Sequence, residues 1–348
     1  MFLIIQLVLH FNIKYGIIII VKGIYDRGLR IMGTVLVTGG CGLIGQHICS
    51  GLLKKGNTVI AVDAQEGHYN DGKLNYSFIE ATPTDKNKYA EIFENNKVDV
   101  VIHAANTVDN DLGPIVTDKE KNDAKLCDKF IYRYAMESDI QKFILLSTDQ
   151  VYAFPKTREP IREDDDLKPV TNYAELKLSS EKALVSEMKL HKTVMCCILR
   201  FAPVYTLSFT DNLTSKIIDV KDKTNFVYGT GQYGFQFCCV HNLVDFILCF
   251  VKNADDMSYA GVYNVSDKLL ITASDVIAFM REHHHLGPVI QRSSGKDAIS
   301  KIFKMFSNKD EKTNYRYLDL STIMNNNMLD NNKASKLLSF RWDIHNTK

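Results

Sequence analysis

A glycine-rich turn that joins an apolar strand to a helix constrains the fold of this chain more than any other feature. The strand is TVLVT at residues 34–38, and the turn that follows reads TGGCGLIG at residues 38–45. Glycines let the backbone approach a pyrophosphate closely, and the start of the helix offers free N–H groups and the positive end of its dipole. The pattern therefore predicts a dinucleotide site formed by Gly39, Gly42, Leu43, Ile44 and Gly45.

An acidic residue at the end of the next strand narrows the choice of dinucleotide. Residues 58–63 read TVIAVD, so Asp63 ends this strand at the same edge of the sheet as the glycine turn. A carboxylate at this place accepts both ribose hydroxyls of NAD and repels the 2′-phosphate of NADP. We therefore expect NAD as the cofactor.

Strand-like and helix-like segments alternate from residue 33 onward. Strands are expected at 34–38, 58–63, 76–80, 98–104, 142–147 and 193–200, and helices at 44–55, 85–96, 116–138 and 173–190. The strands are nearly continuous in Val, Ile and Leu, which is typical of a parallel sheet buried on both faces. The order predicts an α/β fold, namely a Rossmann-like doubly wound parallel sheet with a smaller mixed C-terminal substrate lobe.

The chain is expected to divide into three parts. These are an apolar extension at 1–31, an NAD-binding domain at 32–205 plus 225–266, and a substrate-binding lobe at 206–224 plus 267–348. The apolar runs at 226–240, 242–251 and 261–267 are expected to return to the main sheet.

Residues 1–31 leave three interpretations open. Met32 stands immediately before the first strand, and the preceding residues have A/T-rich codons, which favours an untranslated leader or a disordered extension. His10, Asn12 and Lys14 interrupt the apolar run, so a membrane-associated helix ranks second and an ordered part of the fold third. No basic region precedes the run, and we do not expect a secretory signal or a membrane partner.

The cysteines favour a reducing compartment. The chain has 8 of them and none forms C-x-x-C. Two adjacent pairs, Cys196-Cys197 and Cys238-Cys239, lie in apolar runs where neighbouring side chains of a strand point to opposite faces. We therefore expect buried free thiols and a cytoplasmic location.

Charge and histidine content exclude two kinds of partner. Lys and Arg number 42 and Asp and Glu 41, so the formal net charge of +1 gives no electrostatic reason to expect nucleic acid. The run His283–His285 ends a helix, and adjacent histidines cannot all face one ion, so we expect no metal. The expected partner is a small-molecule substrate.

A tyrosine four residues before a lysine is a candidate catalytic pair. The spacing occurs three times, at Tyr69/Lys73, Tyr152/Lys156 and Tyr173/Lys177. Only the last lies in a clean helical run, where positions i and i+4 share a face. Thr148 follows the strand at 142–147, at the sheet edge where ligands of doubly wound folds bind. A nearby ammonium stabilises a phenolate, so Tyr173 with Lys177 can act as a base while Thr148 bonds the reacting oxygen.

These motifs together resemble the extended short-chain dehydrogenase/reductases, also called the NAD-dependent epimerase/dehydratase family. The segments TGGCGLIG, VIHAAN (101–106), STDQVY (147–152), YAELK (173–177) and LRFAPVY (199–205) fall in the family's order. The resemblance implies a catalytic set of Thr148, Asp149, Tyr173, Lys177 and Asn122. It also implies NAD contacts from Ala104, Ala105, Asn106, Tyr173 and Lys177, and a homodimer packed through the helices at 116–138 and 173–190.

Four positions depart from the family pattern. Gln150 stands where related dehydratases place the Glu that takes a proton, so we do not expect dehydration. Pro203 and Phe235 stand where nucleotide-sugar enzymes place an Asn and a diphosphate-binding Arg, and Thr82 replaces an adenine-binding Asp. The changes at Pro203 and Phe235 weaken the expectation of a nucleotide-sugar substrate without excluding it.

The expected activity is hydride transfer at a secondary alcohol carbon. An NAD-dependent epimerase or oxidoreductase of a sugar or nucleotide sugar ranks first. A dehydrogenase or reductase of a non-nucleotide alcohol or ketone, such as a steroid-like or small carbonyl compound, ranks second. A non-catalytic NAD-binding regulator ranks last, because such a protein has no need of the Tyr173–Lys177 pair.

Overall fold

The computed structural model describes residues 33–67, 75–106, 116–153, 159–169, 171–219, 223–254, 256–292 and 328–347. The extension at 1–31, the pair Tyr69/Lys73 and Lys156 lie outside the described residues. Within the described part, no helix is long and apolar enough to cross a membrane.

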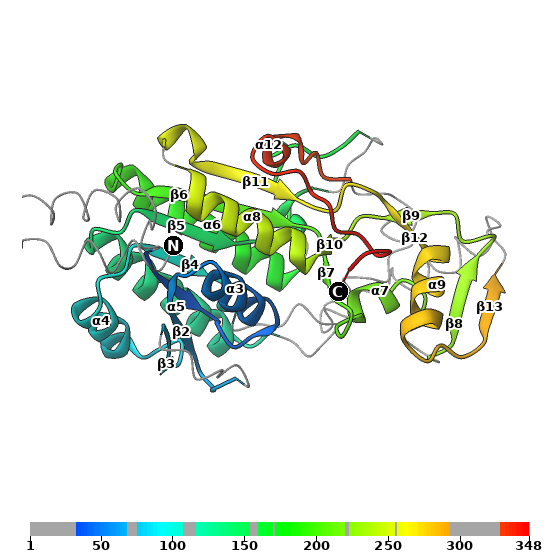
Figure 1. Cartoon of the computed structure of the whole chain (residues 1–348), viewed down its shortest axis with the longest axis horizontal. Helices are drawn as coiled ribbons and strands as arrows, with labels where there is room; N and C mark the ends of the chain where they lie inside the picture. Colours follow the sequence, from blue (N-terminus) through cyan, green and yellow to red (C-terminus); the bar gives the residue numbers. More distant parts are fainter. Residues whose placement is uncertain are drawn as a thin grey trace, which may run out of the picture.

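A seven-stranded parallel sheet forms the centre of the molecule, in the order β11-β6-β5-β4-β1-β2-β3 (Figure 1). Its strands are β1 (Thr34–Thr38), β2 (Thr58–Asp63), β3 (Tyr76–Glu80), β4 (Val100–His103), β5 (Lys142–Leu146), β6 (Met195–Phe201) and β11 (Gly261–Val265). The strand order reverses between β1 and β4, which is the switch point where doubly wound sheets bind ligands at the carboxyl ends of the strands. The predicted fold class is confirmed.

Helices cover both faces of this sheet. They are α3 (Leu43–Lys54) and α8 (Val240–Asn253) on one face, and α4 (Lys86–Asn95), α5 (Asp118–Glu137) and α6 (Asn172–Leu190) on the other. Strand residues alternate between the two cores: Val35 and Val37 pack with α3 and α8, whereas Leu36 packs with α4 and α5. The apolar runs of the sequence are therefore strands buried on both sides.

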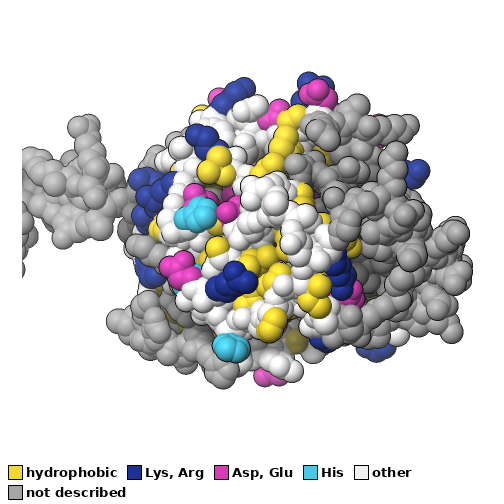
Figure 2. All heavy atoms as spheres, turned by 90° about the vertical axis from the view of Figure 1, so that its right-hand side faces the viewer, with side chains coloured by type: hydrophobic (Ala, Val, Ile, Leu, Met, Phe, Trp, Pro, Cys, Tyr) yellow, Lys and Arg dark blue, Asp and Glu magenta, His cyan; other side chains and the backbone are white. Residues whose placement is uncertain are grey.

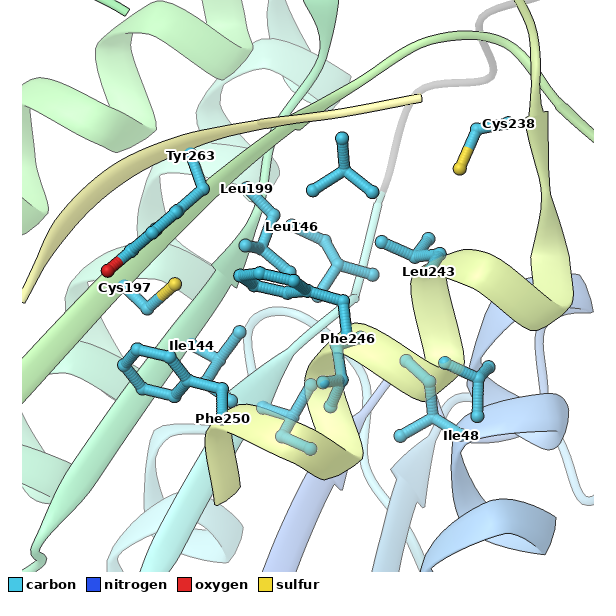
Figure 3. Packing of buried hydrophobic residues seen from close by; sticks show 14 of the residues in the cluster. Ile48, Ile144, Leu146, Cys197, Leu199, Cys238, Leu243, Phe246, Phe250 and Tyr263 are labelled. Carbon is cyan, nitrogen blue, oxygen red and sulfur yellow. The ribbon is translucent and has the colours of Figure 1, made fainter. Parts of the chain in front are cut away.

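Figure 3 shows the core between α8 and the sheet. Phe246 and Phe250 of α8 lie against Ile144 and Leu199 of the strands, and Ile48 of α3 completes the layer. The adjacent cysteines follow the same alternation, since Cys197 lies in this core and Cys196 in the core on the opposite face. All eight cysteines are free, as predicted.

A smaller lobe follows β6 and lies beyond the carboxyl ends of the strands (Figure 1). It contains three described two-stranded sheets, β7 (Val204–Tyr205) with β10 (Cys238–Cys239), β9 (Gly234–Phe235) with β12 (Ile271–Thr272), and β8 (Asn225–Tyr228) with β13 (Val289–Arg292). Helices α7 (Asp211–Thr214) and α9 (Ala273–His283) belong to this lobe. The 3₁₀ turn η1 (Asp149–Val151) follows β5, the 3₁₀ turn η2 (Met257–Tyr259) precedes β11, and α12 (Asn332–Ser335) packs against β11.

Two expected returns to the main sheet are wrong. The segment at 226–240 instead supplies β8 and β9, which pair with β13 and β12 of the smaller lobe. The segment at 242–251 belongs to helix α8, because Leu243, Phe246, Ile247 and Phe250 recur at helical spacing on one buried face. The third return, at 261–267, is confirmed as β11. The division into lobes remains our proposal, with residues 204–205 and 225–239 moved to the smaller lobe.

The C-terminal segment packs back onto the start of α8. The Asn242 amide donates to the Trp342 carbonyl at 2.7 Å, and its oxygen accepts from the Arg341 and Trp342 N–H groups. The same amide donates to Asp267 at 2.8 Å. Asp267 is fully buried and also accepts from Cys239 N at 2.7 Å and Tyr205 Oη at 2.8 Å. One carboxylate thus joins β7, β10 and α8.

Figure 2 shows the end of the molecule that carries β8, β13 and α9, where hydrophobic side chains lie among basic and acidic ones. Ile290 of β13 is 51% exposed. His284 of the predicted histidine run bonds the Leu207 carbonyl at 2.9 Å, and no group of three potential metal ligands occurs among the residues described.

Candidate functional site

A cavity of about 670 Å³ lies at the carboxyl ends of the central strands and reaches the smaller lobe. Residues predicted for the site that line it are Gly39, Gly42, Leu43, Ile44, Gly45, Asp63, Ala104, Ala105, Asn106, Thr148, Tyr173 and Lys177. The fold therefore brings the glycine turn and the Tyr173 helix to one cavity.

The backbone of the glycine turn forms a hollow, here called the glycine cradle, that side chains in place of the glycines would fill. Gly39 has φ +67°, and a Cβ there would lie 2.7 Å from the Ala105 Cα. A Cβ on Gly45 would collide with the Gly39 carbonyl. Helix α3 begins after Gly42 with no side chain capping it and no acid in its first turn. Its N-terminus therefore suits an anion such as the pyrophosphate of a dinucleotide.

Asp63 borders this cradle at the end of β2. Its Oδ2 accepts from Cys41 N at 3.0 Å, and its Oδ1 accepts from Ala64 N at 2.8 Å. The carboxylate thereby ties the glycine turn to the loop after β2 and lines the cavity. The cradle and this acid together fit a dinucleotide with free ribose hydroxyls.

Tyr173 and Lys177 lie on the buried face of α6, whose first turn is capped by Thr171. The Lys177 Nζ donates to the Leu146 carbonyl at 3.1 Å and lies 6.0 Å from the centre of the Tyr173 ring. Burial lowers the pKa of Lys177, although Asp128 and other nearby groups partly oppose this change. The pair therefore presents a phenol and an amine to the cavity wall from one turn of one helix.

Thr148 lies just after β5 and caps the 3₁₀ turn η1. Its hydroxyl donates to the Asp149 Oδ1 at 3.2 Å and accepts from the backbone N and side-chain Nε2 of Gln150, at 3.3 Å and 3.1 Å. Asp149 is half-buried. It accepts the hydrogen bond of Thr148 and does not line the cavity.

Asn122 is not brought to the cavity. It is exposed on α5, whereas Glu120, Asp123 and Cys127 of the same helix line the cavity. Their spacing of three and four residues could have identified the inward face from the sequence. The predicted motif position therefore falls on the wrong side of this helix.

The smaller lobe adds lining residues that motif reasoning did not single out. They are Phe209, Asp211 and Asn212. Residues 201–204, from the end of β6 to the start of β7 and within the motif LRFAPVY, line the cavity as well. Asn212 is fixed by donating to the Val204 carbonyl at 2.7 Å. Phe235 does not line the cavity and lies buried beneath the Lys216 ammonium, 5.3 Å from its ring centre. No local signal marks these residues, because the loops of this lobe position them.

A buried ion pair between Glu181 and Arg200 lies next to the candidate catalytic residues. Glu181 follows Lys177 by one turn of α6, and its Oε2 lies 2.8 Å from the Arg200 Nη2 of β6. Ser147, the neighbour of Thr148, donates to the Glu181 carboxylate, and Arg200 also donates to the Glu163 carbonyl at 3.1 Å. The pair connects α6 to the ends of β5 and β6.

Comparison with known proteins gives relatives of two activities. The chain is 25% identical over 266 residues to dTDP-D-glucose 4,6-dehydratase of Dictyostelium discoideum, covering 70% of this chain and 60% of that protein. It is 33% identical over 151 residues to UDP-glucose 4-epimerase of Halalkalibacterium halodurans, covering 42% of this chain and 44% of that protein. The chain thus spans less than two thirds of the length of either relative.

Solved structures share the fold at lower identity. A UDP-glucose 4-epimerase of Thermotoga maritima, solved with UDP-glucose, superposes with a TM-score of 0.63 at 21% identity, covering 88% of this chain and 93% of that one. A UDP-glucuronic acid 4-epimerase of Bacillus cereus, solved with NAD, gives a TM-score of 0.64 at 20% identity, covering 89% and 94%. The model of the NAD dependent epimerase/dehydratase family matches residues 35–266. The chain belongs to this NAD-dependent epimerase/dehydratase family.

Proposed function

We propose that this chain is an NAD-dependent epimerase or oxidoreductase that transfers hydride at a secondary alcohol carbon of a sugar or nucleotide sugar. The observation that carries the proposal is the meeting of Thr148, Tyr173 and Lys177 with the glycine cradle around one cavity. NAD, when bound, supplies the acceptor and donor of the hydride.

The chain's own residues hold and move the proton. Tyr173 takes the proton of the substrate hydroxyl, and the buried Lys177 ammonium favours the phenolate that this step needs. Thr148 donates a hydrogen bond to the reacting oxygen. The glycine cradle would hold the pyrophosphate of NAD, and Asp63 its ribose.

The test compares Tyr173→Phe with the wild type. Turnover should fall by at least about a thousandfold, the upper range for loss of a proton-transfer group, while NAD binding is retained. Tyr259→Phe in η2, remote from the cavity, is the matched control and should keep full activity. Activity of Tyr173→Phe within threefold of the wild type would reject the assignment.

Epimerisation or net oxidation is favoured over dehydration, because the Gln150 side chain is a neutral amide that cannot accept a proton. Incubation of the protein with UDP-glucose or dTDP-glucose, followed by product analysis, tests this choice. A 4-keto-6-deoxy product would overturn it.

A non-nucleotide alcohol or ketone is the second candidate substrate. Among the described residues that line the cavity, Lys177 is the one cationic side chain, and four carboxylates accompany it. Arg292 of β13, a cationic side chain of the smaller lobe, is paired with Asp219 at 2.8 Å and lies over the Phe226 ring. Calorimetry with UDP, dTDP and their glucose conjugates on NAD-loaded protein discriminates: micromolar binding supports the nucleotide sugar, and no binding at millimolar ligand supports the second candidate.

Homodimer formation and a cytoplasmic location are part of the same proposal. The helices α5 and α6 pack side by side, and Val185 and Leu190 of α6 are exposed. A dimer through these helices would cover both side chains, and light scattering with and without Val185→Glu measures it.

A further inference from the structure

The Thr148 hydroxyl makes contacts that use its full hydrogen-bonding capacity. A threonine hydroxyl has one proton to donate and two lone pairs that accept. In the structure both accepting positions are occupied by Gln150, through its backbone N at 3.3 Å and its side-chain Nε2 at 3.1 Å. The single proton is directed at the Asp149 Oδ1, 3.2 Å away.

We infer that Gln150 is a positioning residue that makes Thr148 a hydrogen-bond donor only. Both lone pairs of Thr148 accept hydrogen bonds from N–H groups, so the hydroxyl cannot accept a further bond from a substrate hydroxyl. Its proton can be donated to a substrate oxygen. The inference rests on the proposed function, in which the reacting oxygen loses its proton to Tyr173 and then needs a donor.

The contact between Thr148 and Asp149 is suited to exchange. At 3.2 Å it is longer than the usual range of about 2.5–3.0 Å for hydrogen bonds between oxygens. The hydrogen bond from Thr148 to Asp149 is therefore weak in the absence of substrate. A substrate oxygen that enters the cavity beside Thr148 can replace Asp149 as the acceptor.

The Gln150 amide carries a cost of its own in this orientation. Its Oε1 is buried and has no hydrogen-bond partner among the described residues, while its Nε2 is used on Thr148. An unpartnered buried acceptor is unfavourable. In the reverse orientation the amide oxygen would accept the Thr148 proton and direct it away from the cavity. The two orientations therefore predict opposite roles for the Thr148 hydroxyl.

The experiment replaces the amide by an isosteric carboxyl. In Gln150→Glu the ionised group can only accept, so it takes the Thr148 proton and frees a lone pair. We expect kcat to fall by about tenfold or more above neutral pH, with KM and NAD affinity nearly unchanged. This is less than the fall of about 10²–10³ that complete loss of an oxyanion donor causes, because the Thr148 hydroxyl is still present. Protonation of the new carboxyl restores a donor, so kcat of this variant should rise as the pH falls, a limb that the wild type lacks.

Two further variants complete the test. Gln150→Met removes the donor at every pH and should lower kcat without the added pH limb. Gln141→Glu, at an exposed position just before β5, is the matched control for the added charge and should behave as the wild type. Retained NAD binding shows that each variant is folded.

The outcomes separate this inference from the proposed function. If Gln150→Glu and Gln150→Met keep wild-type kcat and pH profile while Tyr173→Phe is inactive, the role of Gln150 is refuted and the proposed function stands. If Gln150→Glu is active and Gln150→Met is not, the amide accepts from Thr148, and the inferred direction is reversed. Activity of Tyr173→Phe would reject the proposed function itself.

Discussion

We propose that Asp63 is the residue whose position most directly decides which dinucleotide the cavity accepts. Its two oxygens already hold the Cys41 and Ala64 N–H groups, so the carboxylate is fixed in place before a ligand arrives. A fixed negative charge cannot move away from a 2′-phosphate, and the cost of that contact is not relieved by rearrangement.

NAD is therefore expected to bind at least about tenfold more tightly than NADP, a factor that corresponds to about 1.4 kcal/mol of repulsion. Asp63→Asn keeps an acceptor and removes the charge, so it should reduce the difference between the dissociation constants of NAD and NADP. The dissociation constants of both cofactors are measured by fluorescence titration, with Glu94→Gln on α4 as the control. Equal constants for the wild type would contradict the role of Asp63.

At the scale of elements, α6 shows why the sequence could predict that Tyr173 and Lys177 lie on one helix beside the cavity. Its Thr171 cap, the spacing of Tyr173 and Lys177, and its place after β5 are local features of the chain. The partners of Glu181, by contrast, come from β5 and β6 and follow only from the fold. Motif reasoning therefore located the helix but not the ion pair that orients it.

The expectations that the structure does not match have different origins. Helix α8 was expected as a strand because its run of apolar residues is nearly continuous, although the helical spacing of its buried face was present in the sequence. Asn122 was matched by motif position, and only packing shows which face of α5 meets the cavity. The lining from Phe209 to Asn212 depends on a loop and on the short helix α7, in which no periodicity can be recognised.

The glycine turn permits a prediction at this scale. Gly45→Ala should abolish measurable NAD binding and destabilise the protein by roughly 1–3 kcal/mol, because the added Cβ meets the Gly39 carbonyl and lies 2.8 Å from the Gly40 Cα. Urea unfolding and cofactor titration measure the two effects. Gly287→Ala, where the added Cβ lies 3.4 Å from the Asn225 amide nitrogen, is the control. Wild-type NAD affinity in Gly45→Ala would show that α3 does not approach the ligand.

At the scale of the whole molecule, Asp267 joins the main sheet region to the smaller lobe. Burial raises the pKa of this carboxyl to about 7, against the three hydrogen bonds that favour its charged form. In the unfolded chain the same group has a pKa near 3.8. The folded state therefore binds this proton more tightly, and its stabilising effect is complete below the lower value and lost as the pH rises through the higher one.

The free energy of unfolding should accordingly fall by about 2–3 kcal/mol between about pH 5 and about pH 8 through this residue. Asp267→Asn remains neutral, and its amide oxygen can still accept from Cys239 and Asn242, so the variant should lose this slope. Urea unfolding across the range measures it, with exposed Asp164→Asn as the control. An unchanged slope in Asp267→Asn would assign the pH dependence to other groups.

The position of β11 has a consequence for synthesis on the ribosome. This strand completes the sheet beside β6, although the chain builds β7 to β10 and α8 between the two. Until residue 265 has emerged, β6 presents an unpaired apolar edge, which is a template for association with other chains. Premature termination ahead of this strand should therefore yield aggregates that chaperones or proteases remove, rather than a shortened enzyme with partial activity.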